Sequence, residues 1–325
     1  MKLDILSLVG SNNKFNVEGK LVVVAGGSKG LGKAMALELA AKGANLLMLA
    51  RSADTLRIAR QEVQAACISS KQIVDAIAVD LARPEEVHRV LHRYHPPDIL
   101  ICTAGGTPDQ VGFLADISPQ AITSCMELNY YTTIFIVQSC LRLWLKAPQT
   151  PSPRHIVLTS STAAFLGLPG YGAYTPAKVA IRALADTLRQ ELFLYGKDAF
   201  RVHCSFPGTF MSTSFLEEQE NKPGLLKALE GTDHTRLELE QRVPSPRTVA
   251  QSIIRGLEVG KEYIAVDFQT ELLLNNMRGP SPRFWAVWDF LLGVVAAVVF
   301  WWFRRGSDRR TMREGQSRRV RDSRV

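Results

Sequence analysis

The feature that most constrains the fold of this chain is a glycine-rich turn between a short apolar run and an amphipathic one. KLVVVAGG (20–27) is continuous and rich in valine, which is typical of a buried parallel strand, and KAMALELAAKG (33–43) has helical spacing. Between them, Gly26 allows a tight turn, Gly30 lets the backbone approach a pyrophosphate, and Gly32 allows close helix packing. Because a helix N-terminus attracts phosphate groups, the segment predicts a dinucleotide-binding unit.

The alternation of apolar and amphipathic stretches continues as far as residue 268. Six further apolar runs predict strands: ANLLMLAR (44–51), IVDAIAVDL (73–81), DILICTAGG (98–106), RHIVLTSS (154–161), FRVHCSFPG (200–208) and EYIAVDF (262–268). Helices are predicted after Ser52 and around 84–95, 118–146 and 174–196. Such alternation implies right-handed crossovers, so we expect an α/β fold, a Rossmann-type doubly wound parallel sheet with helices on both faces.

We expect one catalytic domain over residues 1–275, because no internal repeat or interdomain linker interrupts the pattern. The segment 209–243 is more polar and less regular, and two interpretations stay open for it: a substrate lid or a surface loop. The opening MKLDILSLVGSNNKF lacks the features of a signal peptide. The five cysteines show no C-x-x-C spacing, so we expect reduced thiols, no metal site and a catalytic domain facing the cytosol.

The end of the second predicted strand indicates which dinucleotide would bind. An acidic residue at this point would bind the ribose 2′-hydroxyl of NAD, but the chain has Arg51 here, and Ser28 and Lys29 lie in the nearby glycine turn. Two cations without an acid favour NADPH as the cofactor. Asp80 and Leu81 end the third strand, where contact with the adenine ring is expected; a helix N-cap is the alternative role for Asp80.

The stretch SSTAAFLGLPGYGAYTPAK (160–178) indicates the reaction class. Tyr174 and Lys178 are four residues apart at the start of a helix, so they share one face. The ammonium is expected to lower the pKa of the phenol from about 10 toward neutrality, so that Tyr174 can exchange a proton with a carbinol oxygen, while Lys178 can also bond the nicotinamide ribose. Ser161, thirteen residues before Tyr174, is placed to bond a substrate carbonyl; it is preferred to the adjacent Ser160 by spacing alone.

A hydrolase is the alternative that the glycine turn raises. GGSKG (26–30) also fits the nucleophile elbow G-x-S-x-G, with Ser28 as the nucleophile. A hydrolase would need an acid and a histidine downstream, and none of His155, His203 and His234 lies in a convincing motif. The sequence therefore favours the dinucleotide site.

These motifs together resemble the short-chain dehydrogenase/reductase family over about residues 18 to 270. Pro207 and Gly208 match the turn that the family places beside the nicotinamide. Two positions depart from the family: Thr103 stands where a second Asn is usual, and Ala25 replaces the usual Thr before the glycine turn. Both departures concern strand and turn stabilisation, so they leave the proton chemistry untouched.

The family resemblance also implies a fourth catalytic residue. LNYYT supplies Asn129 at that position, beside Ser161, Tyr174 and Lys178. By the same resemblance, Asn129 holds a water that links Lys178 to bulk solvent, and Tyr174 and Lys178 contact the cofactor. An enzyme using NADPH on a ketone or CH–OH group is thus expected.

Four stretches look more closely like the 3-ketodihydrosphingosine reductases, particularly those of fungi: TAGG (103–106), the stretch 160–186, EEQENKPG (217–224) and MRGPSPR (277–283). The resemblance implies reduction of 3-ketodihydrosphingosine, a long-chain keto-lipid, at the cytosolic face of the endoplasmic reticulum in sphingolipid biosynthesis. A membrane-associated retinol or steroid dehydrogenase and a catalytically silent NADP-binding scaffold stay open as alternatives. For the oligomeric state, a homodimer and a homotetramer both stay open.

The end of the chain predicts contact with a membrane. Residues 284–303 are apolar with tryptophans near both ends, and their length suits a hydrocarbon core of about 30 Å, although Asp289 interrupts them. Residues 304–325 form an arginine-rich tail that carries +6 of the net charge of +8, which favours anionic membrane lipids as partners over nucleic acid. Since tail and catalytic domain both favour the cytosol, we expect a re-entrant or interfacial segment with Asp289 near the headgroups.

Overall fold

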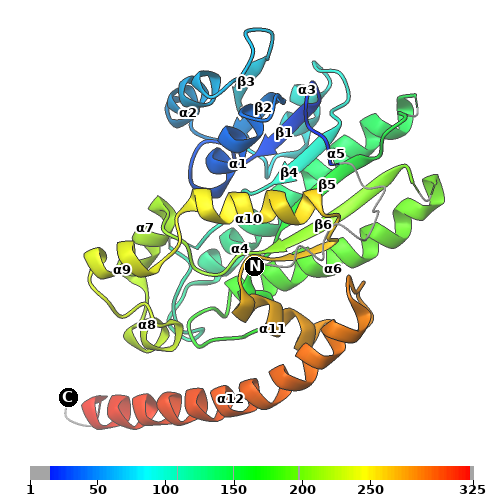
Figure 1. Ribbon diagram of the computed structural model, residues 1–325. Helices are drawn as coiled ribbons and strands as arrows, with labels where there is room; N and C mark the ends of the chain where they lie inside the picture. Colours follow the sequence, from blue (N-terminus) through cyan, green and yellow to red (C-terminus); the bar gives the residue numbers. More distant parts are fainter. Residues whose placement is uncertain (1–14, 108, 149, 197, 323–325) are drawn as a thin grey trace.

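A parallel sheet of seven strands forms the centre of the molecule, which is described by a computed structural model (Figure 1). The structure describes residues 15–107, 109–148, 150–196 and 198–322, so residues 1–14 of the expected domain and 323–325 of the tail lie outside it. The strands are β1 (Leu21–Ala25), β2 (Asn45–Ala50), β3 (Val74–Ala78), β4 (Ile99–Cys102), β5 (Arg154–Thr159), β6 (Phe200–Phe206) and β7 (Tyr263–Ala265). Their order is β3-β2-β1-β4-β5-β6-β7, which confirms the doubly wound α/β fold and all seven predicted strands.

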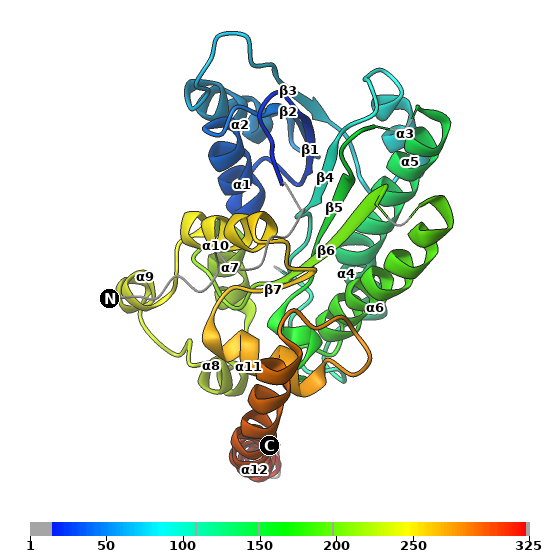
Figure 2. The same cartoon turned by 45° about the vertical axis from the view of Figure 1, so that its right-hand side comes forward.

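Helices cover both faces of the sheet, as predicted (Figure 2). One face carries α1 (Gly30–Ala40), α2 (Ala53–Ala65) and α10 (Pro246–Glu258), and the other carries α3 (Pro84–Leu91), α5 (Thr132–Lys146) and α6 (Tyr174–Leu192). Successive strand residues point to opposite faces, so Val23 packs into the α3–α5–α6 core while Val22 and Val24 pack into the other. This double burial explains why the strands are continuous apolar runs.

The single helix predicted around 118–146 is interrupted in the structure. It consists of α4 (Pro119–Met126), a π-helical turn over Glu127–Tyr131 and then α5. The turn carries Asn129, which is fully buried. π-Turns within helices are frequently found at functional sites.

The segment 209–243, expected to be less regular, forms three short helices. They are α7 (Thr213–Asn221), α8 (Gly224–Glu230) and α9 (Arg236–Arg242). Ser212 caps α7 and Thr235 caps α9, each by accepting a hydrogen bond from a backbone N–H of the first turn. The helices are too short for a clear apolar period, which is why the sequence pattern did not reveal them.

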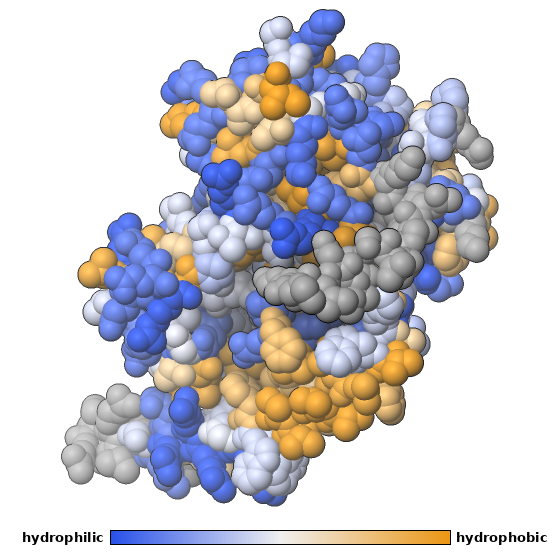
Figure 3. Space-filling model, viewed as in Figure 1, coloured by the Kyte–Doolittle hydropathy of each residue, from blue (hydrophilic) through white to orange (hydrophobic). Residues whose placement is uncertain are grey.

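Two final helices follow the sheet: α11 (Phe268–Met277) and α12 (Ala286–Asp322), which is 37 residues long and therefore about 55 Å. Within the described chain, residues Ala286–Ser317 are long and apolar enough to cross a membrane by length and composition. Leu292 and Ala296 of α12 pack on Leu272 of α11. The other sides of its first half form an exposed apolar surface, whereas its second half is hydrophilic (Figure 3).

The acidic residue that interrupts the apolar run has a protein partner. Asp289 is buried and forms an ion pair with Arg278, which is also buried at the end of α11. The backbone N–H groups of Phe284 and Trp285 also donate to the Asp289 carboxylate, at 3.2 and 3.4 Å. Asp289 therefore lies at the junction of α11 and α12, and its position relative to the lipid headgroups stays a prediction.

Candidate active site

A cavity of about 1010 Å³ opens at the carboxyl ends of the central strands, where the strand order reverses. It is lined by ten of the residues expected from the sequence: Gly26, Ser28, Lys29, Gly30, Arg51, Asp80, Leu81, Ser161, Tyr174 and Lys178. The other two, Gly32 and Asn129, are buried beside it. Helices α7 and α8 and residue Phe303 of α12 complete its lining.

Close contacts with neighbouring backbone require glycine at two positions of the turn. Gly26 has φ +94°, and a Cβ on it would lie 2.6 Å from the backbone nitrogen of Ala104. A Cβ on Gly32 would overlap the carbonyl oxygen of Gly26 and lie 2.5 Å from the hydroxyl of Thr103. That hydroxyl donates a 2.9 Å hydrogen bond to the carbonyl of Ala25, so Thr103 ties β4 to β1 where the family usually has an asparagine.

The helix start beyond this turn suits a phosphate group. Lys29 is the N-cap residue of α1, and its side chain makes no capping hydrogen bond, so the first N–H groups of the helix have no side-chain cap. Because such groups bind anions, the turn and α1 together fit the pyrophosphate of a dinucleotide.

The end of the cavity where we expect the adenine carries the predicted cation and acid. Arg51 is exposed, and no carboxylate of the described residues forms an ion pair with it. Asp80 accepts a 3.0 Å hydrogen bond from the N–H of Ala82, whereas the N-cap of α3 is Arg83. The N-cap alternative for Asp80 is therefore wrong: its carboxylate stabilises the turn after β3 and lines the cavity.

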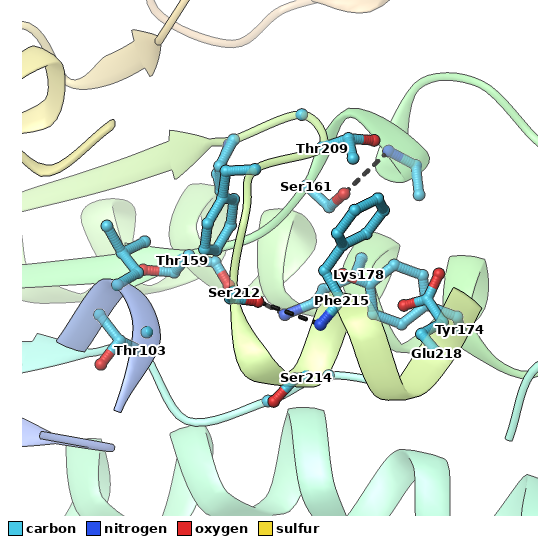
Figure 4. A pocket seen from close by; sticks show the side chains of 18 of the residues that line it. Thr103, Thr159, Ser161, Tyr174, Lys178, Thr209, Ser212, Ser214, Phe215 and Glu218 are labelled. Carbon is cyan, nitrogen blue, oxygen red and sulfur yellow. Dashed lines mark hydrogen bonds between the residues drawn. The ribbon is translucent and has the colours of Figure 1, made fainter. Parts of the chain in front are cut away.

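The two serines at the end of β5 face different partners. Ser160 donates its hydroxyl proton to the backbone carbonyl of Lys178 at 2.7 Å. The Ser161 hydroxyl accepts from the N–H of Ala163 at 3.2 Å and is hydrogen-bonded to the Tyr174 phenol. Ser161 is thus the serine that interacts with Tyr174, and Figure 4 shows its second hydrogen bond, with the N–H of Ala163.

Burial controls the two titratable groups expected to move protons. It raises the pKa of Tyr174 above its ordinary value of 10; the charge of Glu218 raises it further, and the hydrogen bond with Ser161 lowers it. Burial also lowers the pKa of Lys178 to about 8. The prediction that Lys178 brings the phenol toward neutrality is wrong for the protein by itself, because the Lys178 Nζ lies 5.5 Å from the centre of the Tyr174 ring and desolvation dominates.

Asn129 lies against the same loop as Lys178. Its Nδ2 donates to the carbonyls of Gly106 and Cys125, both at 2.9 Å, and its Oδ1 accepts from the N–H of Gly106 at 3.0 Å. A Cβ on Gly105 would lie 2.6 Å from this Oδ1 and 3.1 Å from the Lys178 Nζ, so both groups border that glycine. With both amide protons used, one lone pair of Oδ1 remains for a further partner.

A buried polar network in the cavity was not predicted. The Lys222 ammonium lies 2.6 Å from the Glu218 carboxylate and 2.5 Å from that of Glu230. The Tyr171 hydroxyl lies 2.7 Å from each of these carboxylates, and Thr107 donates to Glu218 at 2.6 Å. In the sequence, the stretch EEQENKPG (217–224) served only as part of the family resemblance. It did not predict a buried network, because an acid-rich helix is normally exposed to solvent. The four-residue spacing of Glu218 and Lys222 was the one signal available.

The hydrolase alternative has no support in this cavity. No histidine is among the described residues that line it. His155 and His203 are buried between β5 and β6, with ring nitrogens 3.0 Å apart, and His234 lies beside Arg242. Ser28 therefore has no histidine available as a base.

Comparison with known proteins agrees with this geometry. Residues 20–223, well over half of the chain, match the short chain dehydrogenase family. The chain is 34% identical to a 3-ketodihydrosphingosine reductase of Neurospora crassa, over 93% of this chain and 84% of that protein. It is 35% identical to one of Aspergillus fumigatus, over 89% and 82% of the two proteins.

Solved structures show the same fold at lower identity. A short chain dehydrogenase from Salmonella enterica aligns with a TM-score of 0.62 and 22% identity, over 77% of this chain and 97% of that chain. One from Shigella flexneri, in complex with NADP, aligns with a TM-score of 0.62 and 21% identity, over 77% and 98%. On the family match and the fungal relatives, the chain belongs to the short-chain dehydrogenase/reductase family.

Proposed function

We propose that this protein reduces 3-ketodihydrosphingosine to dihydrosphingosine with NADPH, in de novo sphingolipid biosynthesis. The observation that carries the proposal is one continuous cavity, which runs from the glycine turn past Ser161, Tyr174 and Lys178 to Phe303 on the apolar helix α12. The names of the fungal relatives support the same reaction.

The residues present fit a nicotinamide dinucleotide. The glycine turn and the start of α1 would hold the pyrophosphate, Asp80 and Leu81 would border the adenine, and Arg51 with Lys29 would hold a 2′-phosphate. When bound, the cofactor supplies the hydride for the ketone carbon. Arg51 and Lys29 are the reason to propose NADPH over NADH.

The protein's own contribution is the proton. Ser161 would orient the ketone oxygen, and Tyr174 would donate the phenol proton to it as negative charge develops. The raised pKa of Tyr174 keeps the phenol protonated at neutral pH, which is the form that reduction needs. Lys178 would then return a proton to Tyr174, supplied from solvent through a water held near Asn129.

A lipid substrate would enter from the side of α12. Leu166, Leu168, Leu229 and Phe303 line the cavity and provide apolar surface for an alkyl chain. Arg310 of α12 also donates a 3.2 Å hydrogen bond to the carbonyl of Ala228 in α8, so this helix contacts the segment 209–243. We therefore propose that this segment is a substrate lid, and that α12 lies in the cytosolic interface of the endoplasmic reticulum membrane.

The test is oxidation of NADPH by the purified full-length protein, with substrate delivered in detergent micelles. We expect turnover with 3-ketodihydrosphingosine and at least tenfold lower kcat/KM with retinal or a ketosteroid. Tyr174→Phe should abolish turnover while leaving NADPH binding largely unchanged. A preference for retinal or a steroid would support the dehydrogenase alternative, and binding of NADPH without any turnover would support the silent scaffold.

A further inference from the structure

The polar network formed by Glu218, Lys222, Glu230, Tyr171 and Thr107, here called the acidic network, has more negative than positive charge. It contains two carboxylates and one ammonium, and the three charged side chains are only 13%, 11% and 1% exposed for Glu218, Glu230 and Lys222. One negative charge thus has no cation within the network. Burying such a charge is costly unless a further cation or a proton joins it.

The acidic network is also short of hydrogen-bond donors. The Tyr171 hydroxyl lies 2.7 Å from a Glu218 oxygen and 2.7 Å from a Glu230 oxygen, but it has one proton to donate. One of these two short contacts therefore lacks a donor proton. Burial, independently, raises the pKa of the Glu230 carboxyl, and the charge of Lys222 opposes this effect. A ligand that brings both positive charge and N–H donors would satisfy the site.

Two unpartnered polar atoms in the same cavity point independently to a ligand. Gln110 is 8% exposed and Thr232 is 3% exposed, and both line the cavity. The Oε1 of Gln110 and the Oγ1 of Thr232 have no hydrogen-bond partner among the described residues. Both are oxygens that can accept a hydrogen bond, and buried acceptors without partners are uncommon in folded proteins. They fit a ligand headgroup that carries N–H and O–H groups.

The acidic network lies next to the proposed proton donor. The charge of Glu218 acts on the pKa of Tyr174 more strongly than any other charged group does. The rings of Tyr171 and Tyr174 have centroids 5.3 Å apart, and Figure 4 shows Glu218 beside Tyr174. The acidic network and Tyr174 therefore border the same part of the cavity, where we expect a ligand atom bonded next to the reacting carbon to lie.

We propose that Glu218 and Glu230, positioned by Lys222 and Tyr171, bind the protonated amino group of the substrate beside the ketone that Tyr174 protonates. The inference rests on the proposed function, because a 3-keto long-chain base carries an amino group on the carbon next to its ketone. It defines the substrate class more narrowly: a 2-amino ketone in its ammonium form. The site then selects against apolar ketones, which would leave the carboxylate charge uncompensated.

A purely structural role for the acidic network predicts something different. In that case the network only joins α7 to α8, and its loss affects every substrate alike. A pair of ketones that differ only in the amino group separates the two roles: 3-ketodihydrosphingosine and 1-hydroxyoctadecan-3-one. The experiment compares kcat/KM for both ketones, with NADPH and the full-length protein.

We expect the wild-type protein to prefer the amino ketone by at least 30-fold. Glu218→Gln and Glu230→Gln should each lower kcat/KM for the amino ketone by about 10- to 100-fold, because each variant loses a charge-assisted contact. For 1-hydroxyoctadecan-3-one, kcat/KM should change less than threefold in both variants. Glu220→Gln, on the exposed side of α7, is the matched control and should leave both values unchanged.

Each outcome decides the proposal. Equal losses for both ketones in correctly folded variants would overturn it and assign the network a structural role. If the variants fail to fold, the wild-type comparison is sufficient: equal kcat/KM for the two ketones overturns the amine site and leaves the proposed reduction intact. If the wild-type protein reduces neither ketone, the proposed function fails, and the inference fails with it.

Discussion

The hydroxyl of Ser160 donates a 2.7 Å hydrogen bond to the backbone carbonyl of Lys178, which ties the end of β5 to α6. The Ser161 hydroxyl, in contrast, is hydrogen-bonded to the phenol of Tyr174. We expect Ser161→Ala to lower kcat by about 100-fold or more, as removal of a donor at the developing oxyanion does in other enzymes. Ser160→Ala should keep kcat within threefold and lower the free energy of unfolding by about 1 kcal/mol. Steady-state kinetics and urea unfolding test both; the reverse pattern would make Ser160 the catalytic serine.

The depressed pKa of Lys178 predicts how the reaction depends on pH. Burial lowers this pKa to about 8, and the protonated form is the one that we propose returns a proton to Tyr174. For ketone reduction, kcat/KM should therefore be constant below pH 7 and fall as the pH rises through about 8. Lys178→Arg keeps the charge, because the pKa of arginine exceeds about 12, so the decrease near pH 8 should disappear even if the rate is lower. A decrease that persists at pH 8 in this variant would assign it to another group.

Arg51 should determine the choice between NADPH and NADH. Loss of one charge-assisted bond to a phosphate is worth about 1.5–3 kcal/mol, so Arg51→Ala should raise the KM for NADPH by about 10- to 100-fold. The KM for NADH should change less than threefold. Arg57→Ala is the control, since Arg57 is an exposed arginine of α2 that does not line the cavity. Equal effects on both cofactors would show that Arg51 contacts a group that they share.

Much of the fold could be predicted from the sequence because its signals are local. The central strands are buried on both faces and so appear as continuous apolar runs. The glycines of the turn lie so close to neighbouring backbone that a side chain there would clash. The relation of Ser161 to Tyr174 was also predictable, since the pair lies within one short stretch. The roles of these residues in catalysis stay predictions that the kinetics above address.

Other parts depend on contacts between distant segments. The π-turn at Asn129 was not predicted, because it spans only five residues within a longer stretch of helical spacing. Glu218 and Glu230 look like surface acids until helices α7 and α8 place them against Tyr171. The sequence likewise could not show that desolvation outweighs the Lys178 charge in setting the pKa of Tyr174.

The exposed apolar surface of α12 should bind a lipid bilayer. Leu291 and Val298 are 50% and 59% exposed, and burying the exposed half of each side chain in lipid is worth about 1 kcal/mol. Leu291→Glu combined with Val298→Glu should therefore lower binding to phosphatidylcholine–phosphatidylserine vesicles at least tenfold in a flotation assay. The kcat/KM for a substrate delivered in micelles should change less than vesicle binding does. Ile58→Glu is the matched control, because Ile58 is also 50% exposed but lies on α2.

The orientation of α12 distinguishes a helix that lies in the membrane interface from one that spans the bilayer. One side of the helix packs on α11 through Leu292 and Ala296, so lipid cannot surround it without breaking that contact. The buried ion pair between Arg278 and Asp289 also holds α11 and α12 together at their junction. An interfacial α12 therefore leaves the arginine-rich end on the cytosolic side, where a C-terminal epitope in sealed microsomes should be cleaved by added protease. Full protection of the epitope would mean that α12 leaves α11 and crosses the bilayer.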